Sequence, residues 1–141
     1  MRPQALVPEL AVTDIRRSLA FWRDILGFAV IYDRPEEGFA AVEREGARVM
    51  LDQLGTGRDW RTGPLDPPLG RGINLEIAVA SIDPLLAALR AHGVALFMEP
   101  ETKTYRVGGG GVTVQQFLVQ DPDGYLLRFS ARRPGHDAHE S

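Results

Sequence analysis

Hydrophobic residues follow two patterns along the chain, and each pattern occurs twice. Spacing of three and four residues, typical of a helix with one buried face, runs over 15–26 and again over 81–92. Thr13 and Asp14 carry side-chain oxygens suited to cap the first helix, and Gly27 is suited to end it. Both segments are therefore predicted as amphipathic helices.

Shorter apolar-rich runs surround the two helices, separated by Gly, Pro and charged residues. Such runs predict strands. Near the end of the chain, Asp121-Pro122-Asp123-Gly124 joins two apolar runs, which predicts a β-hairpin over 115–130. The other predicted strands cover residues 6–12, 28–32, 39–42, 48–54, 73–79 and 95–98.

The order strand, helix, strands is predicted twice, which indicates two pseudo-symmetric modules in tandem. We expect one domain, with module one at about 5–54, a Gly/Pro-rich linker over 55–71, module two at about 72–131 and a polar tail over 132–141. The four glycines at 108–111 precede neither a Lys-Ser/Thr pair nor a helix, so they predict a hairpin turn and not a phosphate loop.

The segment VTDIRRSLAFWRDILGF and the later DPDG turn together resemble the vicinal oxygen chelate superfamily. This superfamily contains glyoxalase I, fosfomycin-resistance enzymes, extradiol dioxygenases and bleomycin-resistance proteins. The resemblance extends over 6–130. It implies an α+β fold of tandem βαβββ modules, whose curved mixed sheets form a cleft (the glyoxalase/bleomycin-resistance fold).

Charge and composition limit the classes of partner that we expect. The net charge is −3 without a basic run, so we expect no nucleic-acid partner. No apolar run is long enough for a signal peptide or a membrane span, and we expect a soluble cytoplasmic protein with no membrane partner. The chain has no cysteine, which excludes disulfides and thiolate metal sites.

The resemblance also implies four metal-ligand positions, in the first and last strands of the two modules. An aliphatic group, a thioether, an amide and a guanidinium stand there, and this set does not suit a hard or borderline divalent cation. We therefore expect no metal and no other cofactor. The four positions are Val7, Met50, Asn74 and Arg128.

The three histidines do not offer a replacement metal site. His92 is expected to cap carbonyls in the last turn of the second helix. His136 and His139 fall in the polar tail.

Strand alternation directs a second set of polar residues toward the expected cleft. Glu9 and Glu76 occupy equivalent places in the two modules. One hypothesis is a buried ion network of these carboxylates with Arg48 and Arg128. The other is a polar floor for a ligand, with apolar walls. The candidate cleft residues are Glu9, Arg48, Met50, Asp52, Asn74, Glu76, Gln116 and Arg128 on the floor, and Trp60, Phe97 and Tyr105 on the walls.

Two predicted loops, over 59–61 and 104–106, are additional candidate contact sites because each places an aromatic residue beside an arginine. Such a pair suits stacking on a flat ligand, a subunit contact, or plain packing against the second module.

Three functions remain open. The first is a metal-free small-molecule binder of the bleomycin-resistance type, sequestering a cationic or aromatic compound and so conferring antibiotic resistance. The second is a metal-dependent lyase, transferase or dioxygenase of the same superfamily, whose ligands would come from other acidic residues. The third is a metal-free enzyme with Glu9 or Glu76 as base. For the metal-dependent enzyme, the acidic residues that could bind the metal are Glu9, Asp52, Glu76 and Glu99.

The resemblance further implies a homodimer.

Overall fold

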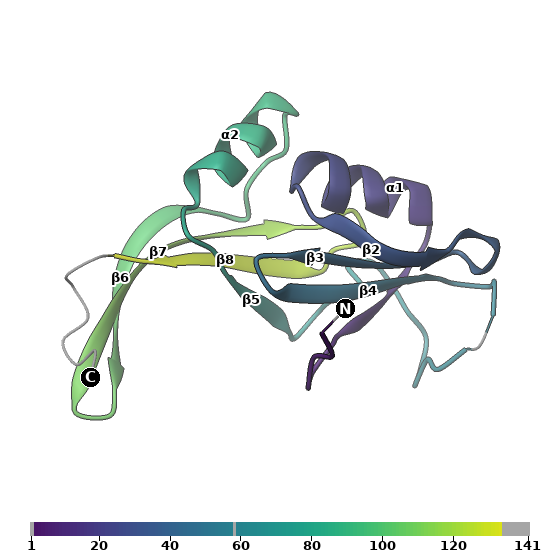
Figure 1. Ribbon diagram of the computed structural model, residues 1–141, viewed down its shortest axis with the longest axis horizontal. Coiled ribbons are helices and arrows are strands. Elements are labelled where there is room, and N and C mark those ends of the chain that lie inside the picture. Colours follow the sequence, from purple (N-terminus) through teal and green to yellow (C-terminus); the bar gives the residue numbers. More distant parts are fainter. Residues whose placement is uncertain (1, 58, 134–141) are drawn as a thin grey trace. The chain divides into compact units, whose positions relative to one another are not determined.

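A computed structural model describes residues 2–57 and 59–133 (Figure 1). These residues form two compact units of α+β structure. The first unit comprises 2–71, except residue 58, together with the short segment Asp121–Tyr125. The second unit comprises 72–120 and 126–133. The tail over 134–141, with His136 and His139, lies outside the described residues.

The first unit contains a four-stranded mixed sheet in the order β1-β4-β3-β2. Strand β1 is parallel to β4, and the other neighbours are antiparallel. The helical segment lies along one face of this sheet (Figure 1). The strands are β1 (Glu9–Val12), β2 (Ala29–Arg34), β3 (Phe39–Arg44) and β4 (Ala47–Gln53), and a 3-10 helix, η2 (Pro35–Glu37), connects β2 to β3.

The predicted first helix is confirmed as one continuous helical segment. It begins as α1 (Ile15–Leu19), capped by the Asp14 carboxylate, which accepts from the amide of Arg16 at 3.0 Å. It continues as a π-helix, η1 (Ala20–Ile25), and the chain turns at Gly27 with a φ of +77°. Hydrophobic spacing does not distinguish these two helix types over so short a length, so the π-helix was not predicted.

The second unit repeats this arrangement with the sheet order β5-β8-β7-β6. Strand β5 is parallel to β8, and β8, β7 and β6 are antiparallel neighbours. Helix α2 covers one face of the sheet (Figure 1). The elements are β5 (Asn74–Ala78), α2 (Asp83–Ala91), β6 (Met98–Val107), β7 (Gly110–Gln120) and β8 (Leu126–Arg132).

Two strand predictions need correction. The strand predicted over 95–98 begins at Met98 and continues to Val107, so the predicted loop over 104–106 lies within β6. Strand β6 is an edge strand whose residues are almost all exposed, and it therefore lacks the apolar alternation that marks a half-buried strand. The strand predicted over 6–12 begins only at Glu9. The closing hairpin is confirmed as β7 and β8. The hairpin turn predicted over 108–111 is shorter in the structure, at 108–109, because Gly110 and Gly111 already belong to β7.

Each unit has its own apolar core. In the first unit, Trp22 and Phe28 are buried and meet edge to face with ring centroids 5.0 Å apart. In the second, Phe117 and Phe129 are cross-strand partners and stack at 5.5 Å. These residues alternate with the polar ones, so each sheet turns its polar positions to the face opposite its helix. No helix of the described residues is long and apolar enough to cross a membrane.

Candidate functional site

The parallel pairing of β1 with β4 sets the floor of the candidate site in the first unit. Glu9 lies opposite Met50, and Ala11 lies opposite Asp52. The intervening Leu10 is buried toward the core. Because side chains two residues apart share a face, Glu9, Ala11 and Asp52 project to the same side of the sheet.

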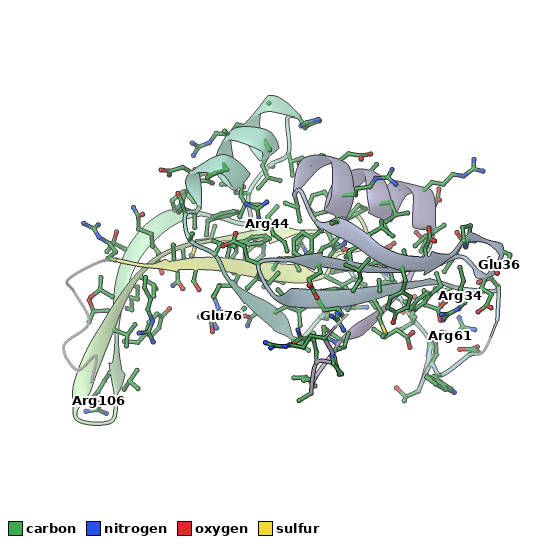
Figure 2. All side chains as sticks on the ribbon, in the orientation of Figure 1. Arg34, Glu36, Arg44, Arg61, Glu76 and Arg106 are labelled. Carbon is green, nitrogen blue, oxygen red and sulfur yellow. The ribbon has the colours of Figure 1, made fainter. Side chains whose placement is uncertain are left out.

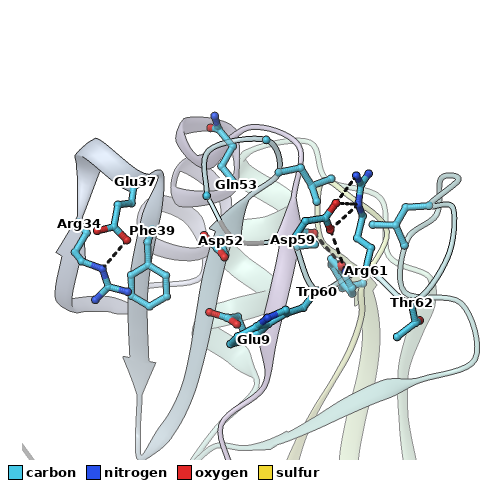
Figure 3. Close-up of a pocket in the computed structure, with 16 residues that line it drawn as sticks. Glu9, Arg34, Glu37, Phe39, Asp52, Gln53, Asp59, Trp60, Arg61 and Thr62 are labelled. Carbon is cyan, nitrogen blue, oxygen red and sulfur yellow. Dashed lines mark hydrogen bonds and ion pairs between the residues drawn. The ribbon is translucent and has the colours of Figure 1, made fainter.

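This face forms the floor of a pocket with a volume of about 370 Å³ (Figure 3). Strands β1, β3 and β4 provide its base, and the loop after β4 provides one side. Figure 3 shows Arg34 and Phe39 on one side, Asp59 and Arg61 on the other, and Asp52 between them. The lining residues are Glu9, Ala11, Arg34, Glu37, Phe39, Asp52, Gln53, Leu54, Gly55, Gly57, Asp59, Trp60, Arg61, Thr62, Leu65 and Tyr125.

Both arginines of the pocket already have a carboxylate partner. Arg34 donates to Glu37 at 3.1 Å, and its guanidinium lies over the Phe39 ring at 4.1 Å from the centroid. Arg61 makes a bidentate pair with Asp59, with a shortest contact of 2.7 Å. Hydrogen bonds from the Arg61 side chain and amide hold the pKa of Asp59 down at about 2. These two pairs leave the remaining carboxylates of the pocket as its available charges.

Those carboxylates belong to Glu9 and Asp52. Within 2–57 and 59–133, neither carboxylate has a hydrogen bond or an ion pair. They are diagonal neighbours on adjacent strands, because Asp52 is two residues beyond the partner of Glu9. Strand spacing and rise per residue place the Cα atoms of such neighbours about 8 Å apart. The pocket floor therefore presents two negative charges to whatever enters it.

Trp60 provides the largest apolar surface of the pocket. Its side chain lines the pocket from the loop after β4 and is 66% exposed. Exposing an indole to water is unfavourable, and an indole face attracts cations and flat rings. Trp60 and the two carboxylates thus join an aromatic surface to negative charge.

Tyr125 closes the pocket and is fixed by the DPDG turn. Its hydroxyl donates to the Ala11 carbonyl at 2.8 Å, and burial, helped by the nearby negative charges, raises its pKa to about 12. Its amide donates to Asp121 Oδ1 at 2.9 Å, while the Trp22 indole donates to Asp121 Oδ2 at 3.1 Å. Burial raises the pKa of Asp121, although these hydrogen bonds oppose the rise. The turn therefore connects the core to a pocket wall.

The second unit carries a separate polar cluster on β5 and β8. Glu76 lies opposite Arg128, at 3.5 Å between Oε1 and Nη2. Arg128 Nε also donates to Asn74 Oδ1 at 3.2 Å, and Ser130 Oγ donates to Glu76 Oε2 at 3.1 Å. Figure 2 shows Glu76 on the side of the sheet away from α2.

Other candidates of the second unit lie on β6 and β7. Gln116 is buried and donates to Glu101 at 2.9 Å and to the Tyr105 hydroxyl at 2.6 Å. Its cross-strand partner is Ser130, so of the two adjacent glutamines it is the one on the polar face, as alternation predicts. Phe97 precedes β6 and is 62% exposed.

The predicted ion network is wrong for the first unit. Arg48 pairs with Glu43 at 2.9 Å and donates to the Arg2 carbonyl at 2.8 Å, whereas Glu9 lies opposite Met50. The tight turn at 45–46 fixes this pairing by placing Glu43 opposite Arg48. In the second unit the predicted Glu76–Arg128 pair is present, but both side chains are partly exposed, so it is not a buried pair.

Of the predicted cleft residues, only Glu9, Asp52 and Trp60 line the pocket. Arg48 and Met50 belong to the same unit but do not line it. The remaining candidates belong to the second unit. The sequence interpretation did not include Arg34, Glu37, Phe39 and Tyr125 among the site residues.

Comparison with known proteins identifies the family. The sequence profile of the Glyoxalase/Bleomycin resistance protein/Dioxygenase superfamily matches residues 5–129. The chain belongs to this superfamily. Bleomycin resistance proteins of Geobacillus stearothermophilus and Staphylococcus aureus are each 29% identical to it over 131 residues, which cover 87% of this chain and 92% of theirs.

A solved structure shares the fold. TioX from Micromonospora sp. ML1 is 22% identical, covers 93% of this chain and 100% of its own, and has a TM-score of 0.69. At this identity the likeness concerns the fold alone.

The metal positions that superfamily resemblance implies do not fit a metal here. In the first unit they are Val7, which precedes β1, and Met50. In the second they are Asn74 and Arg128, whose guanidinium is bonded to the Asn74 oxygen. A guanidinium is itself a cation, and an aliphatic side chain offers no donor atom. The residues described include no group of three or more His, Cys, Asp or Glu side chains placed to hold a metal.

Proposed function

We propose that the protein is a metal-free small-molecule binder of the bleomycin-resistance type, and that the pocket of the first unit takes a cationic, aromatic compound. The observation that carries this proposal is the combination, in one pocket, of the exposed indole of Trp60 with two carboxylates, Glu9 and Asp52, that have no partner among the described residues. A protonated amine or guanidinium would pair with the carboxylates, while a flat ring would stack on the indole.

Size and charge support the same ligand class. A volume of about 370 Å³ lies in the range of small-molecule pockets, which is roughly 300–1,000 Å³. Four acidic side chains line the pocket against two arginines, so its formal charge is 2 − 4 = −2. The arginine that lies over Phe39 gives an internal example of a cation over an aromatic ring in this pocket. The name shared by the curated relatives makes bleomycin the first compound to test, and antibiotic resistance the role to examine.

Intrinsic fluorescence offers a direct assay. The chain has two tryptophans, of which Trp22 is buried and Trp60 is exposed in the pocket. Bleomycin and a panel of cationic aromatic compounds are titrated into wild-type protein, with Trp60→Phe to assign the signal. Glu9→Gln and Asp52→Asn are each expected to weaken binding about tenfold, because each removes one charge-assisted contact.

Glu36→Gln serves as the matched control, since Glu36 is exposed and does not line the pocket. Its affinity should equal that of wild type. Equal affinity in Glu9→Gln and Asp52→Asn as well would contradict the proposed role of the floor carboxylates.

The alternative is a metal-dependent lyase, transferase or dioxygenase of the superfamily, and metal content separates it from the proposal. Purified protein is incubated separately with manganese, iron, nickel and zinc, dialysed and subjected to elemental analysis. The proposal expects no stoichiometric metal, because the donor set of Val7, Met50, Asn74 and Arg128 is unsuited to one. One metal per chain would support the enzymatic alternative.

We further propose that the protein acts as a cytoplasmic homodimer without nucleic-acid or membrane partners. The net charge of −3 argues against nucleic-acid binding. Light scattering tests the dimer, which should have twice the chain mass of 15.5 kDa. A mass of one chain at micromolar concentration would refute the dimer without affecting the pocket.

A further inference from the structure

We propose that Arg128 is the centre of an oxyanion-binding site in the second unit, for a small molecule that carries a carboxylate or phosphate. This site is distinct from the pocket of the first unit and has the opposite charge preference. It is built on adjacent strands, because Asn74 and Glu76 of β5 lie opposite Leu126 and Arg128 of β8.

Two contacts orient the guanidinium of Arg128 but do not use all of its N–H donors. It has five N–H donors. Its Nε donates to Asn74 Oδ1 at 3.2 Å, and its Nη2 lies 3.5 Å from Glu76 Oε1. Within the described part of the chain, no further contact holds the group, so both N–H groups of Nη1 and one N–H group of Nη2 remain for a ligand. One N–H of Nη1 and one N–H of Nη2 are parallel, and such a pair matches two oxygens of a carboxylate or phosphate.

Glu76 neutralises the guanidinium only partly. Charge-assisted N–H···O contacts are about 2.7–2.9 Å long, and the 3.5 Å separation exceeds this. The Glu76 side chain is 51% exposed, so solvent screens the pair, and its second oxygen accepts from Ser130. Asn74, the partner at shorter distance, is uncharged. Arg128 is therefore held in place by one neutral and one weak ionic contact and keeps positive charge to offer.

Arg128 stands at one of the four metal-ligand positions that the superfamily resemblance implies. A guanidinium there cannot bind a cation, but it can bind an anion. The side chain of Arg128 is 28% exposed, so a small oxyanion can reach it.

The test observes the NMR signal of the Arg128 side chain directly. Phosphate and acetate are titrated separately, at constant ionic strength, into ¹⁵N-labelled protein while the arginine Nε–Hε signals are recorded by NMR. The proposal expects a saturable shift of the Arg128 signal with at least one anion, and the tighter anion indicates the ligand class. Arg90 is the matched internal control, because it has a comparable 3.4 Å pair with Glu99 and, among residues 2–57 and 59–133, no side-chain amide oxygen hydrogen-bonded to it.

Variants distinguish a specific anion site at Arg128 from nonspecific electrostatic attraction to the protein surface. Arg128→Gln should abolish the binding, Arg128→Lys should weaken it about tenfold because the fork is lost, and Glu76→Gln should bind several-fold more tightly. Arg90→Gln should bind like wild type. Shifts of Arg128 that rise linearly without saturation, or anion binding that persists in Arg128→Gln, would overturn the proposal. Neither result would affect cation binding in the first unit.

Discussion

The two units share a topology but use equivalent glutamates differently. Glu9 of β1 and Glu76 of β5 are equivalent in the sequence repeat, and each lies opposite a residue of the parallel strand beside it. Opposite Glu9 is Met50, which cannot pair with a carboxylate, whereas opposite Glu76 is Arg128. The cross-strand neighbour thus decides whether a repeated glutamate is available to a ligand or is used internally.

The repeat-related turns differ in the same way. The β3–β4 turn at 45–46 is exposed, whereas the β7–β8 connection buries Asp121 and Asp123. Asp121 accepts hydrogen bonds from two backbone amides and one indole. The first turn makes a local, surface ion pair between Arg44 and Glu45 at 3.4 Å, whereas the second holds a pocket wall.

The largest effect is expected from a substitution that disrupts the β7–β8 connection. Asp121→Ala leaves three buried donors without an acceptor and is expected to lower the free energy of unfolding by about 2–4 kcal/mol. Urea denaturation measures this change. Glu45→Ala in the exposed turn is the control and should cost less than about 1 kcal/mol. Equal costs would mean that the buried contacts of Asp121 add nothing.

A smaller effect comes from making the first unit resemble the second. Met50→Arg places a guanidinium opposite Glu9, and we expect it to pair with that carboxylate and lower the affinity for a cationic ligand about tenfold. Calorimetric titration measures the affinity. Met50→Leu controls for the loss of the thioether and should bind like wild type; undiminished binding in Met50→Arg would show that Glu9 is not used.

The reverse exchange, which makes the second unit resemble the first, should have little effect on the free energy of unfolding. Arg128→Met removes the partner of Glu76, but because both side chains are partly exposed the free energy of unfolding should change by less than about 1 kcal/mol. Urea denaturation tests this too. A loss of several kcal/mol would indicate that the pair is a structural element of the sheet.

The smallest effect concerns a pocket carboxylate that is already paired. Arg61→Gln should raise the pKa of Asp59 from about 2 part of the way toward 3.8, since the guanidinium supplies the largest lowering contribution while the backbone amide of residue 61 remains as a donor. The stabilising effect of this pair is present above pH 3.8 and is lost as pH falls through 2. A carboxyl NMR titration measures the pKa, and an unchanged value in the variant would assign the low pKa to another cause.

The sequence predicted most of the fold because most elements left a local signal. Helical spacing, the Asp14 cap, Gly27 and the DPDG turn each appear directly in the chain. Strand β6 was missed over most of its length because an exposed edge strand has no apolar alternation.

The site was predicted less completely. Alternation placed Glu9 and Asp52 on one face, but Arg34 and Phe39 meet through the register of β2 and β3, which a bulge between Val30 and Tyr32 shifts. No local pattern encodes that shift. The Glu43–Arg48 pair, in contrast, could have been found, because the tight turn after residue 44 implies their register.

The central claim is that Glu9 and Asp52 bind the positive charge of a ligand. The most direct test compares a cationic aromatic ligand with its neutral isostere, by calorimetry, on wild type and on the double variant Glu9→Gln/Asp52→Asn. We predict that wild type prefers the cationic compound by about tenfold or more and that the double variant shows no preference. A preference that survives intact in the double variant would contradict the claim.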